Sequence, residues 1–264
     1  MKKSILDLTL RSLERLSERH VLLRLTHEQP LPEMVPGQFV EVRIDDAAGT
    51  FLRRPISINL VDRQQNELWL MVAMVGNGTR WLSSLKPGDV VNCVLPLGNG
   101  FTAPSPLTTF HSPLLIGGGV GVAPLLFLGA SLKEQGFTPT FLLGGRSAKD
   151  VLELDIFNKY GRVCVTTEDG TLGEQGFVTN HRVLKESFDH IFTCGPTPMM
   201  KAVARYAREH DIPCEASLEN MMACGLGACL CCVEKMRKED CGEETANICV
   251  CKEGPVFNIK RLLW

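Results

Sequence analysis

The chain has few aromatic residues and no long basic run, and both shortages argue against nucleic acid as a partner. Aromatic residues make up 6% of the 264 residues, and the formal net charge is −2. Binding sites for single-stranded nucleic acid need stacked aromatic side chains, and binding to phosphate backbones needs clustered positive charge. The sequence therefore predicts no nucleic-acid partner.

Charge is also missing along one segment. No Asp, Glu, Lys or Arg occurs in residues 90–132, which is long enough for a membrane helix. Glycines and Pro124 interrupt the most apolar part, so a strand, a glycine turn and a helix fit better. Near the N-terminus, Asp7 and Arg11 interrupt the apolar stretch that a signal peptide needs. We therefore expect a cytoplasmic protein with no membrane segment.

Cysteine is the residue type in excess. The chain has 11 cysteines, and most of them fall between Cys224 and Cys251. An odd total, clustered in one segment without a signal peptide, argues against a disulfide framework. This distribution indicates a metal or cluster site.

Hydrophobic patterning divides the chain into three predicted domains. Residues 1–104 contain short runs of Val, Ile and Leu between turn sequences, which predicts an antiparallel β-barrel. Residues 105–212 alternate short apolar strands with helical patterns, which predicts a doubly wound parallel sheet that binds ligands at its carboxyl ends. Residues 213–264 form a small cysteine-rich domain, so the fold class is multi-domain β plus α/β.

The expected barrel strands are His20–Thr26, Gln38–Ile44, Pro55–Val61, Leu68–Val75 and Val90–Leu95. In the α/β domain the expected strands are Leu114–Ile116, Thr140–Leu143, Arg162–Thr166 and His190–Cys194, with helices at Pro124–Gln135 and Met199–His210.

Cysteine spacing provides the strongest chemical signal. Cys224, Cys229 and Cys232 have the C-x₄-C-x₂-C spacing of plant-type 2Fe–2S proteins. Gly225 and Gly227 between them allow the backbone to fold around a cluster and direct amides at its sulfurs. The alternatives are a zinc site, to which a C-x₂-C pair could contribute, and inert buried thiols.

The fourth cluster ligand is not determined by spacing. Cys241, Cys249 and Cys251 all lie further along the chain. Cys249 and Cys251 would share one face of a strand, so the residues alone leave the choice open.

A glycine-rich turn predicts dinucleotide binding. It follows a predicted strand and opens a predicted helix, and Gly119, Gly121 and Pro124 form G-x-G-x-x-P. Free backbone amides and the helix dipole at such a turn suit a pyrophosphate. Arg146 could contact a 2′-phosphate or face solvent, so the choice between NAD and NADP stays open.

The barrel carries a weaker signal at Arg54-Pro55-Ile56-Ser57. An arginine and a hydroxyl close together on one strand can hold a phosphate and a flavin ring, although an exposed surface turn is the alternative.

Taken in order, these motifs resemble the ferredoxin–NAD(P)H reductase superfamily. They are the R-P-x-S strand, the G-x-G-T turn at residues 76–79, the glycine turn and the Cys194-Gly195-Pro196 loop. The tail from Glu219 to Phe257 is similar to the electron-transfer subunits of NAD-dependent dihydroorotate dehydrogenases. The resemblance covers nearly the whole chain.

The resemblance implies three cofactor sites. It places FAD in the barrel, at Arg54, Pro55, Ile56, Ser57, Met71, Val72, Ala73, Gly78 and Thr79. It places NAD at Gly117, Gly119, Gly121, Pro124, Cys194, Gly195 and Pro196, with a buried structural thiol as the alternative for Cys194. It assigns the cluster to Cys224, Cys229, Cys232 and Cys251.

It also implies a function. Electrons would pass from the FMN of a dihydroorotate dehydrogenase catalytic chain, through the cluster and FAD, to NAD⁺, in pyrimidine (UMP) biosynthesis. The implied assembly is a heterotetramer with two copies of each chain, and no residue of this chain is needed as a general acid or base. The alternatives are an NAD(P)H-handling subunit of a sulfhydrogenase or a ferredoxin-dependent transhydrogenase, and a zinc-stabilised module without activity.

Overall fold

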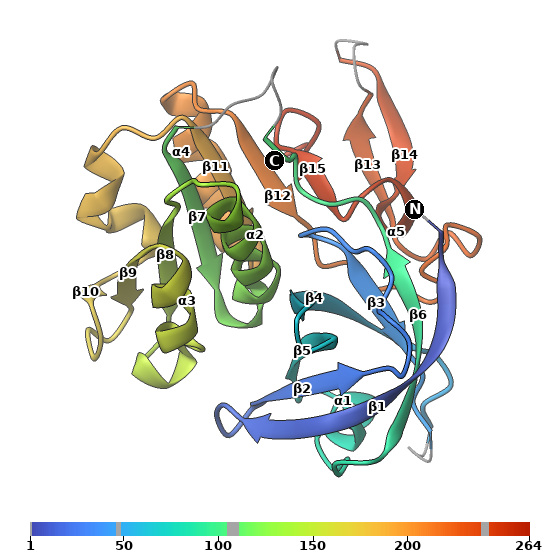
Figure 1. Cartoon of the computed structure of the whole chain (residues 1–264). Coiled ribbons are helices and arrows are strands. Elements are labelled where there is room, and N and C mark those ends of the chain that lie inside the picture. The colour runs from blue at the N-terminus through green and yellow to red at the C-terminus, as the bar shows by residue number, and fades with distance from the viewer. Residues whose placement is uncertain (1, 46–48, 105–110, 239–242) are drawn as a thin grey trace.

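The first six strands form a closed antiparallel barrel with the order β1-β2-β5-β4-β3-β6 (Figure 1). The computed structural model of the protein describes residues 2–45, 49–104, 111–238 and 243–264. The barrel elements are β1 (Ser4–Arg15), β2 (His20–Thr26), β3 (Phe39–Val42), β4 (Arg54–Asp62), β5 (Glu67–Ala73), α1 (Asn77–Leu82) and β6 (Val90–Leu97).

All five expected barrel strands are present, and the structure adds β1. This strand alternates buried Leu8 and Leu10 with exposed residues such as Asp7. Only one face of β1 is apolar, so it lacks the continuous Val, Ile and Leu runs that mark the other strands.

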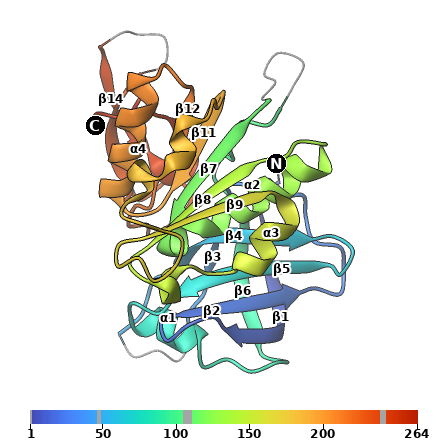
Figure 2. The ribbon, with the colours of Figure 1, turned by 90° about the vertical axis from the view of Figure 1, so that its left-hand side faces the viewer.

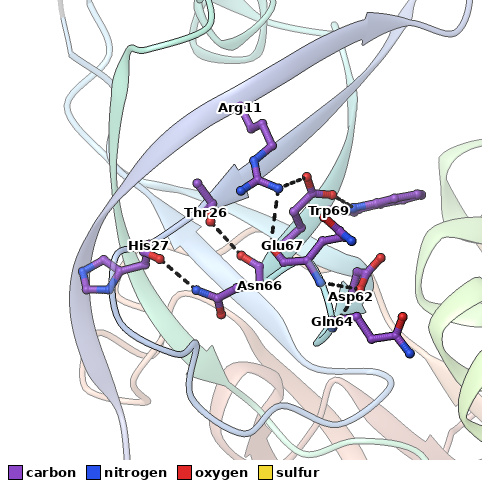
Figure 3. A network of polar contacts seen from close by, with 9 residues as sticks. Arg11, Thr26, His27, Asp62, Gln64, Asn66, Glu67 and Trp69 are labelled. Atoms are coloured by element: carbon purple, nitrogen blue, oxygen red, sulfur yellow. Dashed lines mark hydrogen bonds and ion pairs between the residues drawn. The ribbon is translucent and has the colours of Figure 1, made fainter.

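A polar network joins β1 to β5 across β2 (Figure 3). Arg11 forms an ion pair with Glu67 at 2.9 Å, and the Trp69 indole donates to the other Glu67 oxygen at 2.9 Å. Asn66 turns the chain with a φ of 51° and donates its side-chain amide to the His27 carbonyl at 2.8 Å. These bonds connect the turn before β5 and the start of β5 to β1 and to the segment that follows β2.

A seven-stranded sheet with the order β10-β9-β8-β7-β11-β12-β15 forms the second layer. Every neighbouring pair is parallel except β12 and β15. The strands are β7 (Pro113–Gly118), β8 (Thr140–Gly145), β9 (Arg162–Thr167), β10 (Glu174–Gln175), β11 (His190–Cys194), β12 (Cys214–Ser217) and β15 (Val256–Asn258). The α-helices are α2 (Ala123–Glu134), α3 (Leu154–Tyr160), α4 (Thr197–Glu209) and α5 (Val250–Glu253). Short 3₁₀ turns are η1 (Gly119–Val122), η2 (Ala148–Asp150), η3 (Val178–Asn180) and η4 (Arg182–Lys185).

Helices cover both faces of this sheet (Figure 2). Successive side chains of a strand point to opposite faces. On β7, Leu115 packs with the apolar residues of α2, whereas Leu114 and Ile116 pack with Met200 and Val203 of α4. The prediction of a doubly wound sheet is confirmed.

The cysteine-rich tail is not a separate layer. Both β12 and β15 belong to the sheet, and the hairpin of β13 (Val233–Arg237) and β14 (Thr245–Cys249) forms a sheet of its own (Figure 1). A strand as short as β15 has no recognisable period in the sequence. The tail is therefore anchored to the seven-stranded sheet at both ends of the cysteine segment.

Helix α2 and one buried polar contact join the barrel to the sheet. Phe127 and Ala130 of α2 pack into the barrel core. Asn59 of β4 donates to both carboxyl oxygens of Glu153, the residue that precedes α3, at 3.0 Å each. Burial raises the pKa of Glu153 to about 7, although the Asn59 bond lowers it.

This carboxyl should make stability depend on pH. The folded protein binds the Glu153 proton more tightly than the unfolded chain, so its contribution is present below the unfolded pKa and is lost as pH rises to about 7. The free energy of unfolding of the parent protein should therefore fall relative to that of Glu153→Gln. We expect this difference to change by about 1–3 kcal/mol between pH 5 and pH 8, in favour of the variant. Urea unfolding at both pH values measures this, and Glu209→Gln, at an exposed site, should show no such difference.

No helix in the described ranges is long and apolar enough to cross a membrane.

Candidate functional site

A cavity of about 270 Å³ lies where the barrel, the glycine turn and the tail meet. Most of the predicted flavin residues line it: Arg54, Pro55, Ile56, Ser57, Met71, Ala73 and Thr79. Val120 and Ala123 border it from the glycine turn and α2, and Leu218 and Met222 border it from the tail. An apolar lining with a few polar groups fits a flavin ring and its phosphates.

Two predicted flavin residues, Val72 and Gly78, do not line the cavity. Val72 is buried in the barrel core. Gly78 lies next to Arg54, because a Cβ added there would be 3.1 Å from the Arg54 Nε. The Thr79 hydroxyl accepts hydrogen bonds from the Val75 and Gly76 amides at 3.0 Å each, which holds the turn in shape.

The predicted nicotinamide residues are brought together at the carboxyl ends of β7 and β11. A Cβ on Gly121 would lie 2.4 Å from the Gly195 Cα. Gly195 has a φ of 147°, and a Cβ there would lie 2.9 Å from the Gly118 carbonyl oxygen. The two loops therefore touch through backbone alone, which requires glycine on both sides. Gly119 begins η1, and Gly117 and Pro124 lie buried where β7 passes into α2.

Cys194 is buried and does not line the cavity. Burial raises the pKa of its thiol well above the usual value, and the charge of Glu219 raises it further. Hydrogen bonding with Ser217 only partly offsets these effects. Cys194 is thus a neutral thiol beside the end of β12.

Glu219 is a site residue that the sequence analysis did not single out. Its side chain is exposed along the flavin cavity, which it lines, and it follows β12 by two residues. Partial loss of hydration raises the pKa of its carboxyl. Its place at the carboxyl end of a strand of the parallel sheet was the available signal.

Backbone amides prepare Cys224 as a ligand. The Leu226 amide donates to its sulfur at 3.3 Å, and the amides of Cys229 and Ala228 do so as well. Burial alone would raise the Cys224 pKa, but these hydrogen bonds lower it to about 6. A thiolate at neutral pH is the form that binds iron.

The other predicted ligands lie around the same loop. Cys229 hydrogen-bonds with the Cys224 sulfur, and the Cys251 amide donates to the Cys232 sulfur at 3.3 Å. The Cys224 charge also acts on the Cys251 thiol, whose pKa burial raises to about 12. Cys249 lies nearby, with its sulfur 3.9 Å from the Gly227 carbonyl oxygen.

The third candidate for the fourth ligand, Cys241, lies outside the described residues. Within the described ranges, no three His, Cys, Asp or Glu side chains converge closely enough to hold a single metal ion. The donor set is thiols around a loop that turns at Gly225 (φ 64°) and Gly227 (φ 84°), with amides aimed at sulfur. This chemistry fits an iron–sulfur cluster.

Comparison with known proteins decides the family. A model of the iron–sulfur cluster binding domain of dihydroorotate dehydrogenase B matches residues 219–263, and a model of an oxidoreductase NAD-binding domain matches residues 115–205. The electron transfer subunit of dihydroorotate dehydrogenase B (NAD⁺) from Bacillus velezensis is 38% identical over 265 residues, 99% of each chain. The same subunit from Fusobacterium nucleatum is 41% identical over 229 residues, 84% of each chain. The chain belongs to this family.

A solved structure extends the likeness to three dimensions. The NADH-dependent reduced ferredoxin–NADP oxidoreductase has a TM-score of 0.84 and 28% identity, covering 97% of this chain and 90% of that one. Membership in the dihydroorotate dehydrogenase B family confirms an oxidoreductase subunit that uses FAD, a 2Fe–2S cluster and NAD. It favours the iron–sulfur interpretation of the cysteines over zinc.

Proposed function

We propose that this chain carries electrons from a dihydroorotate-oxidising catalytic chain to NAD⁺ in pyrimidine biosynthesis. The observation that carries this proposal is the single cavity shared by the barrel, the glycine turn and the segment leading into the cysteine loop. When bound, the flavin supplies the conversion between one-electron and two-electron transfer. The chain's own residues bind and orient the carriers, and the Glu219 carboxyl lies at the cavity wall.

The residue assignments are part of the proposal. The domain boundaries are 1–104, 105–212 and 213–264. The FAD would be held by Arg54, Pro55, Ile56, Ser57, Met71, Val72, Ala73, Gly78 and Thr79, with Glu219 added from the structure. The nicotinamide cofactor would be held by Gly117, Gly119, Gly121, Pro124, Cys194, Gly195 and Pro196, and the cluster by Cys224, Cys229, Cys232 and Cys251.

The relatives are electron transfer subunits, and a subunit of this kind implies a catalytic partner chain. Our proposal adds that the partner carries FMN, that two copies of each chain assemble, and that the complex works in the cytoplasm. The exposed surface around the cysteine loop supports docking there. Met221, Leu226 and Leu230 are large apolar residues with exposed fractions of 82%, 45% and 64%. An exposed apolar patch beside a redox centre is typical of a protein–protein interface.

A charge in this patch should weaken docking. We expect Leu230→Glu to lower affinity for the catalytic chain by about 10-fold or more, because the carboxylate would be desolvated in the interface. Sedimentation velocity with both chains measures this. Phe177→Glu, which replaces a 62% exposed phenylalanine in the nucleotide-binding domain, is the matched control and should bind normally. Normal binding by both variants would place the interface elsewhere.

A further inference from the structure

Glu41 lies between the barrel and the cysteine loop. Along β3, Val40 and Val42 point into the barrel core, so Glu41 points outward. A Cβ added to Gly225 would be 2.6 Å from the Glu41 Cγ and 3.0 Å from its Oε1. The Glu41 carboxyl therefore contacts the loop that carries the first two predicted cluster ligands.

The flavin cavity lies on the other side of Glu41. Pro55 is its cross-strand partner on β4, and Phe39 lies two residues away on the same face of β3. Both Pro55 and Phe39 line the cavity. Glu41 thus occupies the barrel wall between the proposed flavin and cluster sites.

The carboxyl is buried without hydrogen bonds. Glu41 is 0% exposed, and neither of its oxygens has a hydrogen-bond partner among the described residues. Burial raises the pKa of Glu41 to about 7; the nearby charge of Arg53 lowers it, and that of Cys224 raises it. The Arg53 guanidinium is itself bonded to Asn92, at 2.6 Å and 3.1 Å.

A buried carboxyl without bonded partners costs stability, and an apolar side chain of similar volume would pack there without that cost. Its place here therefore calls for a role that depends on charge. Reduction potentials of 2Fe–2S clusters respond to nearby charge, because a negative group disfavours an added electron.

We propose that Glu41 is a positioning residue for electron flow: its charge lowers the reduction potential of the cluster relative to the flavin and so favours transfer from cluster to flavin. This inference rests on the proposed function, because it requires both cofactors. The cluster loses one electron in that transfer and the flavin gains it, so no other reactant is needed.

The test is a redox titration of the anaerobically purified full chain, followed by electron paramagnetic resonance of the cluster. The titration is done at about pH 9, because alkaline pH favours the ionised carboxyl on which the effect depends. At the parent protein's midpoint potential, Glu41→Gln should raise the ratio of reduced to oxidised cluster by about 3- to 10-fold. Glu41→Asp, which keeps the charge, should stay near the parent value.

Glu153→Gln is the matched control. It neutralises a half-buried glutamate at another contact between the barrel and its neighbours, and it should leave the cluster potential unchanged. An unchanged or lower cluster potential in a Glu41→Gln protein with full iron and sulfide would overturn the inference. It would also be overturned if both Glu41 variants folded but lost the cluster, because Glu41 would then only support the loop. Absence of iron and sulfide from the parent protein would instead contradict the proposed function.

Discussion

Cys251→Ala is expected to remove the cluster and lower dihydroorotate-dependent reduction of NAD⁺ by more than about 100-fold. Changes to groups that only support a metal ligand already cost about 10- to 100-fold, so loss of a ligand should cost more. Cys251 is buried, and its amide donates to the Cys232 sulfur, so it lies within the predicted ligand set. NADH-driven flavin reduction should persist, because the nicotinamide loops lie at the ends of β7 and β11, whereas Cys251 lies in α5.

Cys249→Ala is the matched control. Its thiol lies near the same loop, 3.9 Å from the Gly227 carbonyl oxygen, but it is not among the proposed ligands. Iron, labile sulfide and turnover with the catalytic chain should remain near the parent values in this variant. If Cys249→Ala lost the cluster and Cys251→Ala kept it, Cys249 would be the fourth ligand and Cys251 would not.

Gly121→Ala is expected to slow NADH-driven flavin reduction on the order of 100-fold. The added methyl would lie 2.4 Å from the Gly195 Cα and 2.5 Å from its nitrogen, so the two nicotinamide loops must separate. A displacement of about 1 Å at a reacting centre can cost about 100-fold in rate. Stopped-flow absorbance at the flavin band measures the rate, and the visible spectrum shows whether flavin and cluster are still bound.

Gly136→Ala separates this steric effect from the general cost of replacing a glycine. Gly136 follows α2, has a φ of 89°, and an added Cβ would meet no atom within 4 Å. Its replacement should lower the free energy of unfolding by about 1 kcal/mol and leave the rate of NADH-driven flavin reduction unchanged. Equal rates in the parent protein and Gly121→Ala would show that the contact between the loops does not position the nicotinamide.

The sequence predicted the elements whose hydrophobic pattern is continuous. The strands at His20–Thr26 and His190–Cys194 have the bounds that were expected. Each of these two strands has buried side chains on both faces, so it reads as an apolar run. The bounds of β3 are shorter than expected, because Gln38 and Ile44 lie outside its ladder.

Features that depend on contacts between distant segments could not be predicted. The pairing of β15 with β12 consists of three residue pairs, and the residues of each pair are about 40 positions apart in the chain. Glu41 reads in sequence as an ordinary polar residue of a half-exposed strand, and only the cysteine loop packed against it makes it buried. Likewise Glu219 becomes a cavity residue only when β12 ends beside the barrel.

The most direct test of the proposed function is optical. The chain would be purified anaerobically with its catalytic partner, and visible spectra recorded while dihydroorotate is added. We predict bleaching of the flavin and cluster bands by dihydroorotate and their recovery on addition of NAD⁺. Bands that bleach with NADH but do not respond to dihydroorotate would contradict the proposal and favour a reductase subunit for another partner, such as a ferredoxin-linked enzyme.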